Sequence, residues 1–193
     1  MPHETEIKLA VPDVRTGRRL LRTAGFLISR RRVFEANTVF DSSKGTLRRG
    51  RTLLRLREAG GLATLTYKGP PLPSRHKTRE ELETEVTDAR VMRSIIEHLG
   101  FRAEWRYEKY RTEYRLERGA GMATLDETPI GVYLELEGSP RWIDRMARVL
   151  GFTHQDYSTA SYSRLYLEYC KKRGIKPGDM IFSRIDAKAQ RTQ

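Results

Sequence analysis

The stretch "ETEIKL" at residues 4–9 alternates charged and apolar side chains. Glu4, Glu6 and Lys8 fall on one side of this alternation, and Ile7 and Leu9 fall on the other. Because successive side chains of a β-strand point to opposite faces, the pattern predicts a strand with one charged and one apolar face. Its meaning depends on whether other strands repeat it.

Further segments sort their charges in the same way. Strands are predicted over roughly 3–9, 27–41, 51–58, 62–68, 78–86, 102–117, 121–126 and 131–137. About eight strands in hairpin-like succession favour a mainly antiparallel sheet that curls or closes on itself. The acids of the charged faces are Glu4, Glu6, Glu81, Glu83, Glu85, Asp126, Glu135 and Glu137, and the bases are Lys8, Arg55, Arg57, Lys68, Arg79, Lys109 and Arg111.

Amphipathic helices are predicted between the strands. Three of them end in a Gly-Phe pair, at Phe26, Phe101 and Phe152, and a fourth covers roughly 160–173. A left-handed glycine followed by an apolar residue that packs back is a frequent helix ending. Candidate N-caps are Asp13, Asp88 and Ser139, with Pro140 in the first turn of the third helix.

These helices need an apolar surface to cover. If they cover the apolar strand faces from outside, the charged faces line the interior of the barrel. The expected fold is therefore α+β and mainly antiparallel β: a closed eight-stranded β-barrel tunnel with amphipathic helices packed outside. Residues 1–170 are expected to form this single domain. Residues 171–193 are expected to form a basic, partly flexible tail, and the part after about residue 174 is expected to be dispensable for chemistry.

The 193 residues carry a net charge of +12, which favours polyanionic partners. No run of 18 apolar residues indicates a membrane span, and the charged N-terminus does not look like a signal peptide. A single cysteine, Cys170, suits a reducing compartment, so a cytoplasmic location is expected. The sequence leaves a monomer and a homodimer open.

A tunnel lined by both signs of charge indicates a metal–polyphosphate complex. Arginine and lysine bind phosphates, whereas carboxylates would repel them unless a divalent cation lay between. Mg²⁺ and Mn²⁺ prefer carboxylate and water oxygens and bridge to phosphates. The sequence contains neither a glycine-rich phosphate loop nor the Cys and His spacing of a zinc site.

At this point the residues resemble a known family. Residues 4–8, "ETEIK", match the ExExK signature of the CYTH superfamily, the triphosphate tunnel metalloenzymes. ExExK alone recurs by chance, but the ordered series is specific. It continues through Arg55-Leu56-Arg57, Lys68-Gly69, Arg79 with Glu81 and Glu83, Lys109-Tyr110-Arg111, Asp126, Glu135-Leu136-Glu137 and Ser161-Tyr162. The resemblance covers nearly the whole chain and implies the same barrel.

The resemblance also implies roles for the charged residues. The triphosphate would be held by Lys8, Arg55, Arg57, Lys68, Arg79, Lys109 and Arg111, with Lys8, Arg57 and Lys68 expected to be catalytic. One or two Mg²⁺ or Mn²⁺ ions would be bound by Glu4, Glu6, Glu81, Glu83, Asp126, Glu135 and Glu137. Three departures bear on the substrate more than on the fold: Ala160, Asn37 and Val39 stand where many relatives have a basic residue, Asp and Tyr.

Three functions stay open at this stage. The favoured one is a metal-dependent hydrolase of inorganic triphosphate or thiamine triphosphate. The second is a class IV adenylate cyclase that converts ATP into cyclic AMP and pyrophosphate. The third is a non-catalytic binder of polyphosphate or nucleic acid, suggested by "SRRRV" at 29–33 and by the basic tail. A nucleic-acid partner is not expected, because a pure binder gains nothing from eight carboxylates beside its cations.

Overall fold

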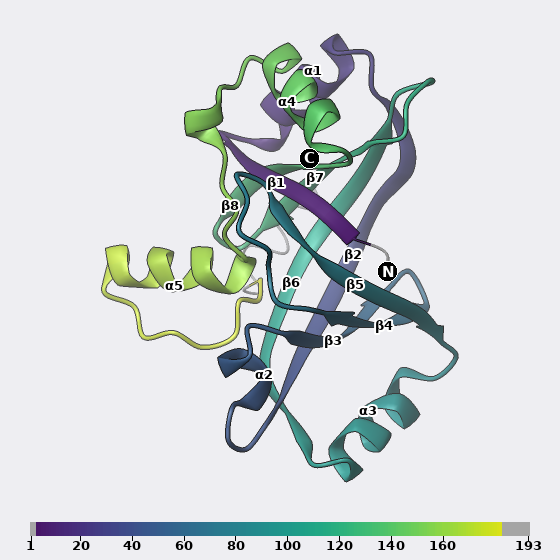
Figure 1. Ribbon diagram of the computed structural model, residues 1–193, viewed down its shortest axis with the longest axis vertical. Helices are drawn as coiled ribbons and strands as arrows, with labels where there is room; N and C mark the ends of the chain where they lie inside the picture. Colours follow the sequence, from purple (N-terminus) through teal and green to yellow (C-terminus); the bar gives the residue numbers. More distant parts are fainter. Residues whose placement is uncertain (1–2, 183–193) are drawn as a thin grey trace.

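The computed structural model describes residues 3–182, and its eight strands close into one antiparallel barrel (Figure 1). Around the barrel the strand order is β1-β5-β4-β3-β2-β6-β7-β8. The strands are β1 (His3–Val11), β2 (Leu27–Ser42), β3 (Leu53–Ala59), β4 (Leu62–Lys68), β5 (Lys77–Val86), β6 (Phe101–Arg115), β7 (Met122–Thr128) and β8 (Gly131–Glu137). The predicted fold class is confirmed.

The helices lie outside the barrel (Figure 1). They are α1 (Val14–Thr23), α2 (Thr46–Arg49), α3 (Ala89–His98), α4 (Pro140–Val149) and α5 (Tyr162–Arg173), together with a 3₁₀ turn, η1 (His154–Asp156). The predicted caps are confirmed: the side chains of Asp13, Asp88 and Ser139 accept backbone N–H groups at the starts of α1, α3 and α4. None of the helices within residues 3–182 is long and apolar enough to cross a membrane.

The predicted Gly-Phe helix endings are also confirmed. Gly25, Gly100 and Gly151 have φ values of 83°, 89° and 86°, in the left-handed region that favours glycine. The N–H of Phe26 donates to the Leu21 carbonyl at 3.0 Å and closes the last turn of α1. Each ending therefore turns the chain sharply from a helix back toward the barrel.

The main hydrophobic core lies between the barrel and the pair α1 and α4. Ile7, Leu9, Leu125, Leu134 and Leu136 are fully buried there, on the outer faces of β1, β7 and β8. α1 approaches β7 so closely that a Cβ at Gly17 would lie 2.6 Å from Leu125 Cδ1. Since these apolar side chains point outward, their strand neighbours of opposite parity point into the barrel.

The sequence did not predict α2. Its start is fixed by Asp41, whose carboxylate accepts the N–H groups of Leu47 and Arg48 at 2.9 and 3.0 Å. As a result β3 begins at Leu53, two residues later than predicted.

Two smaller clusters complete the apolar packing. Phe40, Leu56, Ala63 and Ile96 pack α3 against β2, β3 and β4. Tyr107, Tyr162 and Met180 join α5 and the chain that follows it to β6. The expected domain boundary at residue 170 therefore falls inside α5, and the expected tail starts as ordered structure. Residues 183–193 of that tail lie outside the described part of the chain.

Candidate active site: a tunnel lined by paired charges

The interior of the barrel carries the charged faces predicted from the sequence. Arg55, Lys109 and Glu135 are only 6%, 2% and 7% exposed, although all three belong to residue types that normally face water. The strand register sets opposite charges across from each other: Lys8 is paired with Glu135, and Arg111 with Asp126. The predicted tunnel with an inward charged lining is thus present.

One half of the lining centres on Asp126, which is completely buried. Its two oxygens accept Arg111 Nε and Nη2 at 2.7 and 2.6 Å, and Oδ2 also accepts Lys109 Nζ at 2.8 Å. The hydroxyl of Tyr162 in α5 donates to the same oxygen at 2.8 Å. Four groups from β6, β7 and α5 therefore meet in one charge-assisted network.

Glu135 extends this network towards β1. It accepts Arg111 Nη2 and forms an ion pair with Lys8 Nζ at 3.0 Å. Burial alone would raise the pKa of Glu135, but Lys8 and Arg111 beside it hold the pKa below its ordinary value. Glu135 is therefore ionised and fixes two of the predicted phosphate-binding cations.

The other half of the lining has a surplus of acids. Lys68 Nζ donates to Glu4 and, at 2.9 Å, to Glu81, while Lys77 Nζ lies 2.5 Å from Glu6 Oε1. Burial, and then the hydrogen bond with Glu4, raise the pKa of Glu81 to about 8. Burial, followed by the nearby charges of Glu4 and Glu6, raises the pKa of Glu137 to about 7.

Glu4, Glu6, Glu81 and Glu137 are here called the acid cluster. Lysines beside Glu4 and Glu6 hold the pKa values of these two below the ordinary value, whereas the pKa values of Glu81 and Glu137 are raised. The cluster offers oxygen donors only, which are the ligands that Mg²⁺ and Mn²⁺ prefer. Within residues 3–182, however, no three acidic, histidine or cysteine side chains are already arranged to hold a metal ion. The donor chemistry fits a divalent ion, and the lysines now occupy the positions between the carboxylates.

The arginines of the lining differ in how fully they are paired. Arg55 donates to the Tyr107 hydroxyl at 3.2 Å, to Thr66 at 3.0 Å and to Glu83 at 3.2 Å. Among the described carboxylates, Arg57 has only distant partners, with Glu35 at 3.9 Å and Glu83 at 3.7 Å.

Arg79 is committed to the backbone instead. Its Nε donates to the Gly69 carbonyl at 2.7 Å, and its Nη2 donates to the Arg51 carbonyl at 2.9 Å. Among the predicted phosphate-binding residues, Arg79 is thus the one whose guanidinium holds two loops together at the end of the tunnel.

The predicted acids on β5 lie progressively closer to solvent. Glu81 is partly buried, the Glu83 side chain is 41% exposed, and Glu85 is exposed. Glu83 accepts the Thr66 hydroxyl at 2.7 Å as well as Arg55. Glu83 is therefore a residue of the tunnel rim.

Three lining residues were missed by the sequence analysis: Glu35, Asn37 and Lys77. Glu35 is 1% exposed and lies 3.5 Å from Lys109 Nζ. Burial would raise its pKa, but Lys109, Arg111 and Arg57 lower it to about 2. Alternation along "FEANTVFD" would have placed Glu35 and Asn37 on one face, and alternation back from Arg79 would have added Lys77.

Within residues 3–182, several buried polar atoms of β2 and β3 have no hydrogen-bond partner. They are both side-chain amide atoms of Asn37, Oε2 of Glu35, Nε of Arg55 and Nε of Arg57. Asn37 lies opposite Arg57 in the β2–β3 register and is completely buried. Most buried polar groups are hydrogen-bonded, so unpaired N–H donors on three residues of the neighbouring strands β2 and β3 indicate a place suited to an oxyanion.

Comparison with known proteins identifies the family of the chain. The CYTH domain profile matches residues 2–148. A Methanocaldococcus jannaschii protein named "Putative adenylate cyclase MJ0240" is 32% identical over 148 residues, covering 76% of this chain and 83% of that protein.

Solved structures show the same fold. The PH1819 protein of Pyrococcus horikoshii superposes with a TM-score of 0.71 at 26% identity, covering 86% of this chain and 98% of its own. The PH1012 protein of the same organism gives a TM-score of 0.71 at 25% identity, over 84% and 98% of the two chains. With the family profile spanning most of the barrel, the chain belongs to the CYTH family.

Proposed function

We propose that this CYTH enzyme is a divalent-metal-dependent hydrolase of triphosphate compounds, with inorganic triphosphate and thiamine triphosphate as candidate substrates. The observation that carries the proposal is the group of unpaired buried donors on Asn37, Arg55 and Arg57 within a lining of lysines and arginines. Phosphate oxygens would satisfy these donors, and each charge-assisted bond of this kind is about twice as strong as a neutral one.

Two sets of cations would bind the triphosphate. Lys8, Lys109 and Arg111 form the set held by Asp126 and Glu135, and Arg55, Arg57 and Lys68 form the set on β3 and β4. Because acids already hold the first set in place, it is preorganised for negative charge that develops in the transition state. Arg57 is the least constrained of these six cations and is free to follow the reacting phosphate. Arg79 would keep its structural role, holding the loops at Gly69 and Arg51 together.

The metal would be held by the acid cluster. Burial and the neighbouring carboxylates raise the pKa values of Glu81 and Glu137 to about 8 and about 7, and a divalent ion would replace the protons that these groups hold near neutral pH. When bound, such an ion supplies charge neutralisation of the phosphates and an activated water. Asp126 and Glu135 are already matched by Lys109, Arg111 and Lys8, so we assign them to holding those cations; Glu83 does the same for Arg55.

Adenylate cyclase activity is the second candidate, favoured by the name of the M. jannaschii relative. The same lining would hold the triphosphate of ATP, and the two reactions differ in which phosphate bond breaks. A fold neighbour from Hippeastrum, the "Putative adenylyl cyclase HpAC1" (TM-score 0.64, 20% identity, 90% of this chain and 97% of that one), is described as having a dominant triphosphatase activity. The hydrolase stays our first choice because the unpaired donors on Asn37, Arg55 and Arg57 need only phosphate oxygens as partners.

A substrate panel tests the proposal. The protein is incubated with inorganic triphosphate, thiamine triphosphate or ATP, each with Mg²⁺, with Mn²⁺ or with a chelator, and the products are separated. We expect phosphate release that requires the metal and that falls in an Arg57→Ala variant but not in Arg22→Ala, a change on the outer surface. Cyclic AMP as the main product, or no turnover of any of the three, would overturn the hydrolase assignment.

Location and assembly stay predictions. Cys170 is a free, buried thiol, which suits the reducing cytoplasm that we propose. We propose a monomer or a homodimer that needs no partner chain for chemistry, because the paired charges and the unpaired donors described above all come from one chain.

A further inference from the structure

The chain after α5 returns to the barrel as an ordered segment. It reverses at Gly174, where φ is 66°, and residues 174–182 are here called the C-terminal strap. Met180 N–H donates to the Arg106 carbonyl at 3.0 Å, and Glu108 N–H donates to the Met180 carbonyl at 2.9 Å. These two bonds make a parallel bridge beside Tyr107 of β6.

Hydrogen bonds that involve side chains also hold the strap. Trp105 Nε1 donates to the Gly178 carbonyl at 3.1 Å, and the Asp179 carboxylate accepts Arg106 N–H at 2.9 Å. Tyr166 of α5 donates to the Asp179 carbonyl at 3.2 Å. Bonds from both α5 and β6 thus hold the strap against the barrel.

The strap replaces a strand where the barrel would otherwise have an edge. β7 pairs only with residues 110–114 of β6, so the backbone of 105–108 has no β7 partner. The strap covers this stretch, and the side chain of its Met180 is only 1% exposed. Its neighbour Ile181, by contrast, is 46% exposed.

Met180 joins the two tyrosines that reach into the charged lining. It forms one buried cluster with Tyr107 and Tyr162. The Tyr107 hydroxyl accepts Arg55 Nη1 at 3.2 Å, and the Tyr162 hydroxyl donates to Asp126. Trp105 stacks on Tyr107 with ring centroids 4.8 Å apart, so the Tyr107 ring is held by the strap and by Trp105 together.

We propose that the C-terminal strap is a positioning element of the triphosphate site, in which Met180 holds Tyr107 so that Tyr107 presents Arg55 to the phosphates. The inference rests on the proposed function of the tunnel. It assigns a role to residues beyond the matched family profile, which ends at residue 148. It also replaces the expectation that everything after about residue 174 is dispensable, since that expectation took no account of Met180.

The test compares matched variants of the full chain. Met180→Ala should raise KM for the triphosphate or lower kcat/KM by about tenfold, the loss expected when one hydrogen bond to a charged group is misplaced. Ile181→Ala, at the exposed neighbour, and a chain ending at Phe182 should both stay near wild type. Met180→Leu keeps the volume and should recover most of the loss. Equal kinetics for Met180→Ala and wild type would overturn the proposal.

A double-mutant cycle separates positioning from general destabilisation. Tyr107→Phe removes only the hydroxyl that accepts Arg55, so it should reproduce the kinetic loss with little change in melting temperature. If Met180 acts through Tyr107, the two changes combined should cost no more than the larger single change. Additive losses would contradict that route.

Binding without turnover keeps this test distinct from that of the hydrolase. Triphosphate binding to the metal-free protein is measured by calorimetry for wild type and Met180→Ala. Weaker binding by the variant supports the strap even if the reaction proves to be a cyclase. Equal binding by the two proteins would overturn the role of the strap and leave the hydrolase proposal standing.

Discussion

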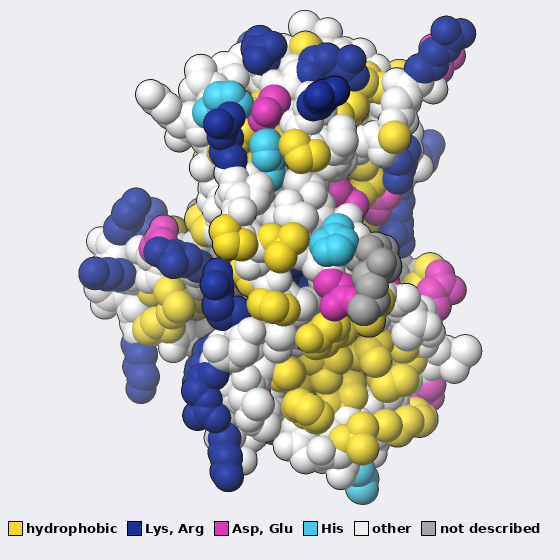
Figure 2. Space-filling model, viewed as in Figure 1, with side chains coloured by type: hydrophobic (Ala, Val, Ile, Leu, Met, Phe, Trp, Pro, Cys, Tyr) yellow, Lys and Arg dark blue, Asp and Glu magenta, His cyan; other side chains and the backbone are white. Residues whose placement is uncertain are grey.

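The tunnel lining and the outer face of α1 are both rich in arginine, but carboxylates balance the arginines of the lining and do not balance those of α1. The lining combines eight acids with eight bases, so its formal charge is zero: Glu4, Glu6, Glu35, Glu81, Glu83, Asp126, Glu135 and Glu137 against Lys8, Arg55, Arg57, Lys68, Lys77, Arg79, Lys109 and Arg111. The whole net charge of +12 must therefore lie outside the tunnel. Figure 2 agrees, since lysine and arginine side chains project around the margin of the molecule.

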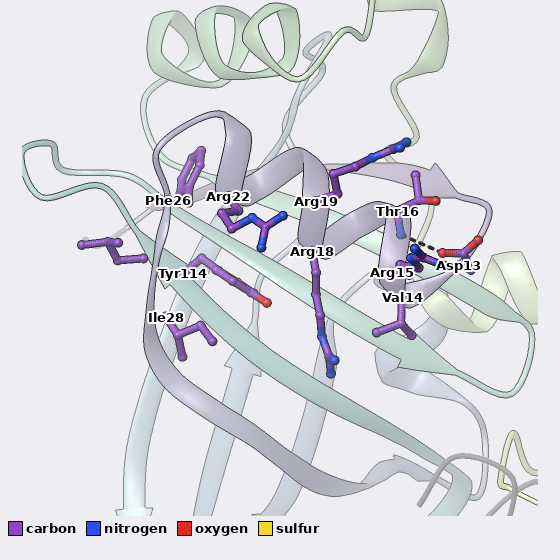
Figure 3. Close-up of a pocket in the computed structure, with 11 residues that line it drawn as sticks. Asp13, Val14, Arg15, Thr16, Arg18, Arg19, Arg22, Phe26, Ile28 and Tyr114 are labelled. Carbon is purple, nitrogen blue, oxygen red and sulfur yellow. Dashed lines mark hydrogen bonds between the residues drawn. The ribbon is translucent and has the colours of Figure 1, made fainter. Parts of the chain in front are cut away.

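α1 carries part of that surplus. Arg15, Arg18, Arg19 and Arg22 are exposed, and none of them forms an ion pair with a carboxylate in the described part of the chain. They border a hollow of about 1390 Å³ between α1 and the first residues of β2, into which Arg18 and Arg22 extend towards Tyr114 (Figure 3). This hollow thus lies outside the barrel, at exposed guanidiniums.

The difference shows why net charge was a poor guide to the site. Exposed arginines contribute little to stability whether or not they are paired, typically 0–1 kcal/mol. A buried cation must instead be matched by acids, so the residues that prepare the tunnel for phosphate cancel one another in the charge sum. Four predictions test this contrast, beginning with the largest expected effect.

Asp126→Asn should be the most damaging single change. It leaves Lys109, Arg111 and the Tyr162 hydroxyl around a neutral amide in a fully buried position. Breaking a buried charge network by removing one partner typically costs about 3–5 kcal/mol. Urea unfolding of the variant checks this, with Glu117→Gln as the exposed control, for which we expect a change below about 0.5 kcal/mol. Equal losses in the two variants would mean that the lining is no more coupled than the surface.

Glu35→Gln should alter the response of stability to acid. Lys109, Arg111 and Arg57 hold the pKa of Glu35 at about 2, against 4.5 when unperturbed. A depressed folded-state pKa stabilises the protein above the unfolded value, and this contribution is lost as pH falls from about 5 towards 2. Wild type should therefore exceed the variant by roughly 3 kcal/mol at neutral pH and lose that advantage in this window.

The measurement is the free energy of unfolding at several pH values for both proteins. Glu58→Gln, on exposed β3 surface, is the control and should follow the wild-type curve. A wild-type advantage that stays constant from neutral pH down to pH 2 would show that Glu35 is not held by its cations.

The sequence predicted the barrel well because side-chain alternation is a local property. Within β1 and β8 the strands are regular, so counting in twos from Glu4 or Glu135 places each side chain correctly. β2 is different, since its register against β6 shifts between Ile28 and Arg30, between Arg30 and Val33, and between Val39 and Phe40. Each shift interrupts the alternation, so β2 cannot be followed in twos along its whole length. Glu35 and Asn37 lie in the regular part between Val33 and Val39, where counting in twos would have found them.

The strap could not be predicted for another reason. Met180 is one apolar residue in a polar segment, without a period that would indicate burial. Its partners, Tyr107 and Tyr162, are distant in sequence and come together only once β6 and α5 are placed. Similarly, the raised pKa values of Glu81 and Glu137 depend on neighbours from β1, so the sequence could name the acids but not the acid cluster.

Arg57→Ala should lower triphosphate turnover by about 10², the usual loss when one electrostatic contact to the transition state is removed. Arg57 is held only by distant carboxylates, so the fold should survive. Adding Mn²⁺ should not restore the rate, whereas a Glu6→Gln variant, which loses a proposed metal ligand, should regain part of its rate at high Mn²⁺. Initial rates across a Mn²⁺ titration, with circular dichroism as the folding control, decide this. Recovery of Arg57→Ala by metal would place Arg57 with the metal ligands.

The smallest effect is expected on the outer face. Exposed arginines should attract single-stranded nucleic acid without sequence preference. Such binding releases counterions from the nucleic acid, and it weakens at higher salt because that release then gains less free energy. Arg19→Ala combined with Arg22→Ala removes two cations from the hollow beside α1 and should lower the slope of log K against log salt by about 1.4, or about 0.7 per phosphate contact. Turnover of triphosphate should stay near wild type, because neither residue touches the tunnel.

Arg57→Ala is the matched control, with the opposite expectation: the same salt slope but lower turnover. Fluorescence anisotropy of a labelled oligonucleotide at several salt concentrations gives the slope. If the α1 variant lost turnover, or if Arg57→Ala lowered the slope, the surplus charge outside and the balanced charge inside would be one continuous site.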